Sequence, residues 1–311
     1  MLSRVADSLY WMSRYMERCD GMLRMLKINY ASSQDDIQEF SWGPALKLCT
    51  YLNEEEAVAL SKNSRDVLLY IVTAKENSNS VLNIVTQARE NGRSVQDHIT
   101  KEMWQCLNDF YHTIREDRVI QWLQKEDPIT ILDILLKQCL LYFGTTDVTM
   151  ARGESHAFIN IGKFLERGVQ TADILDVKFS ALNQGSDKAA DAAYWKFLLL
   201  SISGYELYLK TYRSGLEAKN VVEQSVLNES FPRSILYSVK NLRQYFERLK
   251  SERNYNSYNE ISFMIGRLES KIRFTTTQTI VGEGLSDFLQ DIKRDLLSIG
   301  STLNKNYFAY S

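Results

Sequence analysis

Two Glu-Arg pairs in similar surroundings are the residues of this chain best suited to chemistry. Residues 10–26 read YWMSRYMERCDGMLRML and residues 159–175 read INIGKFLERGVQTADIL. Aligned without gaps, the two segments place Glu17-Arg18 on Glu166-Arg167. A positioned glutamate can transfer protons, and the guanidinium fork of arginine binds carboxylate or phosphate. Adjacent residues project about 100° apart on a helix, so each of these charges needs a partner elsewhere in the fold.

A basic residue one helical turn before each pair completes two candidate charge clusters. Their members are Arg14, Glu17 and Arg18 in the first segment and Lys163, Glu166 and Arg167 in the second. Two interpretations stay open. The clusters could meet near a pseudo-twofold axis and hold a carboxylate or phosphate, or they could form a structural ion-pair network that locks helices together.

Two Arg-Ser pairs are candidate anion-binding residues. Arg93-Ser94 and Arg233-Ser234 are each expected to open an amphipathic helix, where exposed N–H groups attract anions. The alternative is that each serine caps its helix and each arginine pairs with a glutamate, for which Glu90 is the candidate beside Arg93.

Metal, cofactor and nucleophile signatures are weak in this sequence. Only three histidines occur, at His98, His112 and His156, and their spacing to acidic residues does not form a ligand set. No HExxH, P-loop or GxSxG motif is present, so we predict no metal site and no cofactor. The catalytic residues, if the protein is an enzyme, stay unassigned.

Long helices must position these groups. The 311 residues include only 3 prolines and 14 glycines, too few for the frequent turns of a strand-rich fold. Apolar residues from Leu9 to Leu26 recur every three or four positions. The net charge of −2 gives no field for nucleic acid, and we expect neither a membrane span nor a signal peptide. A cytoplasmic protein is predicted, and its four widely spaced cysteines suggest a reducing compartment.

Internal similarity indicates a duplicated helical unit. The Glu-Arg segments, the tryptophans Trp42 and Trp195, and the Arg-Ser pairs recur in the same order. We therefore predict an all-α fold, a single domain over 1–311 built as a helical bundle from pseudo-symmetric halves of about 1–146 and 147–311. The inter-half turn is expected at Gly144-Thr145-Thr146, and a second loop at residues 184–187. Asp127-Pro128 is expected to cap a helix that runs to about Tyr142.

Four segments carry a resemblance to the bacterial alpha-E family, a helical domain of unknown function. They are LSRVADSLYWMSRYMER, QARENGRSVQDHITKEMWQCLN, MARGESHAFINIGKFLER and GEGLSDFL. The similarity runs nearly end to end. One departure lies in the third segment, where the family usually has tryptophan and this chain has His156.

The resemblance implies a setting rather than a reaction. Alpha-E members are typically encoded beside, or fused to, a circularly permuted ATP-grasp protein, so a helical partner of an ATP-dependent peptide ligase or modification system is the first expectation. The second is an enzyme that uses Glu17 or Glu166 in acid-base chemistry on a carboxylate or peptide. The third is a homodimeric binding module that uses tyrosines such as Tyr205, Tyr208 and Tyr212.

Overall fold

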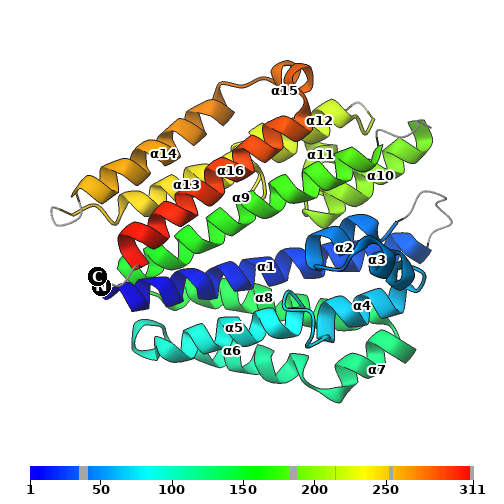
Figure 1. Cartoon of the computed structure of the whole chain (residues 1–311), viewed down its shortest axis with the longest axis horizontal. Helices are drawn as coiled ribbons and strands as arrows, with labels where there is room; N and C mark the ends of the chain where they lie inside the picture. Colours follow the sequence, from blue (N-terminus) through cyan, green and yellow to red (C-terminus); the bar gives the residue numbers. More distant parts are fainter. Residues whose placement is uncertain (35–40, 183–187, 214, 252–254, 309–311) are drawn as a thin grey trace. The chain divides into compact units, whose positions relative to one another are not determined.

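The described residues of the chain form helices and no β-strand, which confirms the all-α prediction (Figure 1). The structure is a computed structural model that describes residues 1–34, 41–182, 188–213, 215–251 and 255–308. The loop predicted at residues 184–187 lies outside the described residues.

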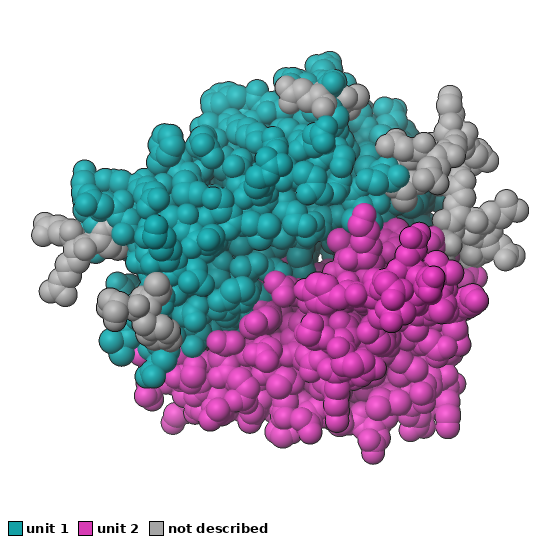
Figure 2. All heavy atoms as spheres, viewed as in Figure 1, with its two compact units in different colours: residues 1–14, 151–311 teal, residues 15–150 magenta. Residues whose placement is uncertain are grey.

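The chain divides into two compact units (Figure 2). Unit 1 contains Met1–Arg14 and Ala151–Ser311, and unit 2 contains Tyr15–Met150. The division at residue 14 falls inside the first helix, α1 (Ser3–Gln34), so the opening turns of α1 belong to unit 1. The first Glu-Arg pair, Glu17-Arg18, therefore lies near the start of unit 2. The basic residue one turn before it, Arg14, belongs to unit 1.

Unit 2 consists of the rest of α1 and a series of shorter helices. These are α2 (Gly43–Cys49), α3 (Glu54–Ser61), α4 (Ser64–Thr73), α5 (Val81–Ser94), the 3-10 turn η1 (Gln96–His98), α6 (Lys101–Ile114), α7 (Asp117–Lys125) and α8 (Pro128–Thr149). Within the unit, α6 packs between α5 and α8, and α7 packs on α4 and α8. Helix α8 is long and apolar enough to cross a membrane by length and composition, a test that core helices also pass.

Unit 1 is organised around its longest helix, α9 (Glu154–Leu182). Its other elements are α10 (Lys188–Ser201), α11 (Tyr205–Thr211), α12 (Ala218–Val222), the π-helical turn η2 (Glu223–Leu227), α13 (Ile235–Glu247), α14 (Tyr255–Arg273), α15 (Thr277–Glu283), α16 (Leu285–Leu303) and the π-helical turn η4 (Asn304–Phe308). Helices α13 and α16 both pack on α9, and α14 packs on α13 and α16. These helices form the core of unit 1, in which Leu165, Val239 and Ile292 are buried.

Helix caps account for several of the observed boundaries. Asp127 accepts hydrogen bonds from two backbone N–H groups and starts α8, with Pro128 at its first position, as predicted. The turn expected at Gly144-Thr145-Thr146 is wrong, because α8 continues to Thr149. Buried side chains on both sides of this glycine, Tyr142 and Thr146, keep the helix anchored to the core of unit 2.

Helices α1 and α9 approach each other closely at Gly162 in unit 1. A Cβ atom built on this glycine would lie 2.3 Å from the backbone oxygen of Tyr10. No Cβ atom fits at that distance, so this packing of the two helices requires glycine at position 162. The contact holds the Glu-Arg segment of α9 beside the opening turns of α1.

Candidate functional site

A buried ion pair joins the two Glu-Arg segments within unit 1. The Nε atom of Arg14 donates to the Oε2 atom of Glu166 at 2.7 Å. The two side chains are 10 % and 3 % exposed, so the contact is closed to solvent. Two of the six predicted cluster residues are thus brought together, although they are 152 positions apart in the sequence.

Aromatic rings complete the surroundings of Arg14. Its Nη1 atom donates to the hydroxyl of Tyr10 at 3.1 Å, and its guanidinium lies 4.6 Å from the ring centre of Trp11. Burial by itself lowers the pKa of Arg14, but attraction to Glu166 and hydrogen bonds to Glu166 and Tyr10 raise it above its ordinary value. Burial also raises the pKa of the Tyr10 phenol. The arginine is therefore a permanent cation whose polar atoms bind groups of the protein itself.

The other predicted cluster residues are arranged differently. Glu17 is fully buried in unit 2, and the guanidinium of Arg18 lies 5.8 Å from the ring centre of Tyr15. Lys163 and Arg167 are half-buried on α9, where both cations lie over the ring of Phe164, at 4.6 and 5.2 Å.

Arg167 also reaches the turn before α13. Its Nη1 atom donates to the backbone oxygen of Pro232 at 3.1 Å, and the hydroxyl of Thr171 donates to the backbone oxygen of Arg233 at 3.0 Å. These bonds fix the turn to α9. The side chain of Ser234 then caps α13 by accepting from the N–H of Tyr237, as the capping interpretation predicted.

The first Arg-Ser pair does not open a helix, so the predicted helix start at Arg93-Ser94 is wrong. Both residues are exposed in the last turn of α5, where carbonyl groups rather than N–H groups point outward. The predicted partner of Arg93 is confirmed: its Nε atom donates to Glu90 at 2.7 Å. This hydrogen bond lowers the pKa of the Glu90 carboxyl.

His156 lies in the interior at the start of α9. Its ring stands edge-on to the ring of Tyr245, with 5.5 Å between the centres. Arg152 contacts the Nε2 atom at 2.7 Å, and because a guanidinium only donates, Nε2 is the accepting nitrogen. An aromatic ring at this position thus packs against α13, which is a structural task that tryptophan also performs.

A polar hollow on unit 1, between α13 and α14, is the site that sequence reasoning missed. Its volume is about 460 Å³. We call this pocket the α13–α14 hollow. It is lined by Glu229, Tyr237, Lys240, Asn241, Arg243, Gln244, Glu247 and Glu269. The charged members on α13, Lys240, Arg243 and Glu247, are three and four positions apart, a pattern that resembles an ordinary solvated face.

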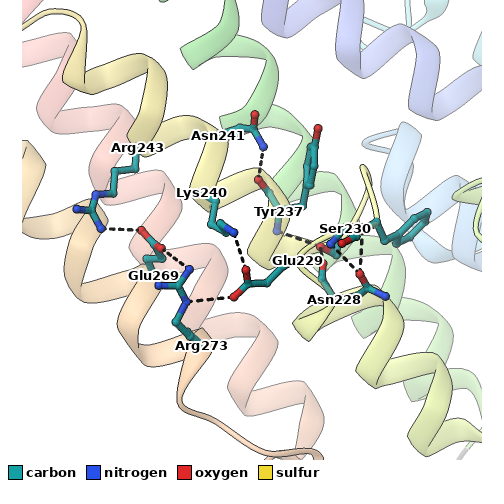
Figure 3. Close-up of polar contacts among 11 residues, drawn as sticks. Asn228, Glu229, Ser230, Tyr237, Lys240, Asn241, Arg243, Glu269 and Arg273 are labelled. Atoms are coloured by element: carbon teal, nitrogen blue, oxygen red, sulfur yellow. Dashed lines mark hydrogen bonds and ion pairs between the residues drawn. The ribbon is translucent and has the colours of Figure 1, made fainter. Parts of the chain in front are cut away.

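Alternating charges run along this hollow (Figure 3). Glu229 accepts from Lys240 at 2.5 Å and from Arg273 at 3.2 Å. Arg273 also pairs with Glu269 at 3.2 Å, and Glu269 accepts from Arg243 at 3.1 Å. Hydrogen bonds from Lys240 and Arg273 lower the pKa of Glu229, so this carboxylate stays ionised. The hollow presents both signs of charge to solvent.

A buried lysine lies apart from these groups, in the last turns of α9. Lys178 is buried beside Tyr194, with its Nζ atom 5.3 Å from the ring centre, and the Tyr194 hydroxyl donates to the backbone oxygen of Lys178 at 2.7 Å. Burial disfavours the ammonium form and lowers the pKa of Lys178 to about 8.

Lys178 is expected to make stability depend on pH in the alkaline range. The unfolded chain keeps this proton up to the ordinary pKa of 10.5, so between pH 8 and 10.5 it binds more protons than the folded chain. Stability should therefore rise with pH in that window. Lys178→Met should remove this rise and stabilise the protein by about 3 kcal/mol at pH 7, because the pKa is lowered from 10.5 to about 8. Urea unfolding of both proteins from pH 7 to pH 10 measures the difference, and parallel curves would contradict the assignment.

The four cysteines are the remaining candidates for a reactive side chain. All of them are buried free thiols. The Sγ atoms of Cys19 and Cys139 lie 3.7 Å apart inside unit 2, and burial raises the pKa of the Cys139 thiol well above its ordinary value. Such thiols are inert as nucleophiles.

Fold and site together define an all-helical protein in which the glutamates of two Glu-Arg pairs are buried. The chain belongs to the Alpha-E family, described as "A predicted alpha-helical domain with a conserved ER motif", and the match covers residues 1–308. No curated protein and no solved structure matches the chain.

Proposed function

We propose that the chain is a helical accessory subunit, without catalytic activity of its own, that holds a peptide for an ATP-grasp ligase in the cytoplasm. The ligase partner follows from what the family resemblance implies. The observation that carries the accessory role is the buried Arg14–Glu166 contact, in which each charge neutralises the other and neither faces solvent. A buried, paired carboxylate braces helices but cannot reach a substrate.

The α13–α14 hollow is the proposed peptide site. A peptide with free ends carries one carboxylate and one ammonium group, which match the cations and anions of the hollow. Arg243 and Glu247 are each 50 % exposed, and exposed ion pairs contribute only about 0–1 kcal/mol. A ligand carboxylate can therefore replace Glu247 at the guanidinium with little loss, while Glu229 accepts the ammonium group.

Peptide-dependent ADP release tests this proposal. The chain is purified with its partner ATP-grasp protein, and short peptides with free ends are compared with the same peptides capped at both ends. We expect ADP release to require this chain and to favour the free peptides. Arg243→Glu should raise the peptide KM roughly tenfold or more, because it removes one charge-assisted hydrogen bond to the peptide carboxylate.

The matched control is Arg93→Glu, which reverses an exposed, paired arginine on α5 of unit 2 and should leave KM unchanged. Equal ADP release without this chain, or failure of the two proteins to associate in gentle salt, would overturn the accessory role. An unchanged KM for Arg243→Glu would remove the hollow as the peptide site.

A further inference from the structure

The outward face of α8 in unit 2 carries a stripe of exposed apolar side chains. Leu140 is 53 % exposed, Leu141 51 % and Val148 80 %. Between them lies Gly144, where an added Cβ atom would meet nothing within 4 Å. An apolar stripe with an open notch at its centre is typical of a surface that packs against another helix.

Charged residues of opposite sign bound the same stripe. Lys137 lies before Leu140, and Asp147 lies beside Val148, and both are exposed. At 3.6 residues per turn, these side chains and Gly144 share one side of the helix. We call this surface the α8 stripe; it consists of Lys137, Leu140, Leu141, Gly144, Asp147 and Val148.

The α8 stripe is complementary to itself in an antiparallel arrangement. Along the helix, Leu140 comes before Tyr142 by the same number of residues as Gly144 comes after it. The same holds for Lys137 and Asp147, so both pairs are symmetric about Tyr142. When two copies of α8 cross antiparallel at that level, Leu140 of each copy faces the notch at Gly144 of the other. Lys137 of each copy then faces Asp147 of the other, as the two-fold symmetry of an isologous dimer requires.

We propose that the α8 stripe is the homodimer contact of this protein. A lipid surface fits less well, because helices that lie on membranes carry basic residues beside their apolar face, whereas Asp147 places an acid there. A contact of one helix pair is small, so the dimer should dissociate at micromolar concentrations. This inference is independent of the proposed peptide site, which lies on unit 1.

Sedimentation equilibrium of the full chain, from about 5 to 500 µM, tests the dimer. The wild type should pass from monomer to dimer across this range. Gly144→Leu should weaken the dimer at least tenfold, because it fills the notch, and it should not disturb folding, because the position is open. Val58→Arg on α3, an equally exposed apolar site of unit 2, is the control and should leave the dissociation constant unchanged.

Charge exchange separates this contact from non-specific association. Lys137→Glu and Asp147→Lys should each weaken the dimer at least tenfold, since each places like charges opposite one another. The variant with both substitutions should return to within about threefold of the wild type. Circular dichroism confirms that each variant is folded.

Three results would overturn the dimer proposal. They are a wild type that stays monomeric at every concentration, a double variant that is as weak as the single variants, and Gly144→Leu that dimerises like the wild type. Binding to vesicles of phosphatidylcholine and phosphatidylglycerol that Leu140→Arg abolishes, in a monomeric protein, would assign the stripe to a membrane surface instead.

Discussion

Arg14→Met is expected to lower the free energy of unfolding by about 3–5 kcal/mol, because it removes a buried cation that pairs with the Glu166 carboxylate at 2.7 Å. Methionine keeps most of the apolar stem that packs on Trp11. The loss of stability therefore measures the removal of the charge and not the creation of a cavity. Urea unfolding followed by circular dichroism measures this change. Glu166→Leu should have a similar effect, since it removes the carboxylate that pairs with the buried Arg14 guanidinium.

The variant with both substitutions provides the sharpest control. Replacing Arg14 by methionine and Glu166 by leucine removes both charges at once, and the total loss should fall to about 1–2 kcal/mol. Arg93→Met, which breaks an exposed pair with Glu90, should change stability by less than about 1 kcal/mol. If the double variant loses as much stability as either single variant, the bracing role of the Arg14–Glu166 pair is contradicted.

Gly162→Ala is expected to destabilise the protein by about 3 kcal/mol, because its methyl group would lie 2.3 Å from the Tyr10 backbone oxygen. A backbone atom cannot move aside as a flexible side chain does, so helices α1 and α9 must separate. Separation would also stretch the Arg14–Glu166 contact. Thermal unfolding of the variant should show a lower Tm, with a loss of cooperativity in unit 1.

Gly266→Ala on α14 is the matched control for Gly162→Ala. Both glycines lie within long helices of unit 1, but an added Cβ atom at Gly266 meets nothing within 4 Å. Alanine there should stabilise the protein by about 0.5–1 kcal/mol through helix propensity alone. Equal effects at the two glycines would show that the close approach at Tyr10 does not constrain the fold.

Local signals predicted helices and caps because their causes lie within a few residues. Asp127-Pro128 starts α8 as expected, and Ser234 caps α13. The turn predicted at Gly144 failed because one glycine weakens a helix by only about 1 kcal/mol, and burial of its neighbours outweighs that loss. The helix start predicted at Ser94 failed because Thr100 supplies the cap of the next helix instead.

Partners in the site could not be assigned from spacing alone. The adjacent charges of each Glu-Arg pair predicted that partners lie elsewhere, and Glu166 pairs with Arg14, one turn before the first pair. Ser13, which aligns with Gly162, is likewise small and fully buried, so residue size at this position carried information about close packing. The α13–α14 hollow depends on the pairing of Arg243 with Glu269 across two helices, which no local pattern reveals.

The measurement that tests the account most directly is ADP release by the partner ATP-grasp protein in the presence of the Arg14→Met, Glu166→Leu double variant. This protein should remain folded while it lacks the buried Arg14–Glu166 pair. If this pair only braces the fold, activity should stay within about threefold of the wild type. A folded double variant that loses activity by a hundredfold or more would place these charges in the chemistry and contradict the account.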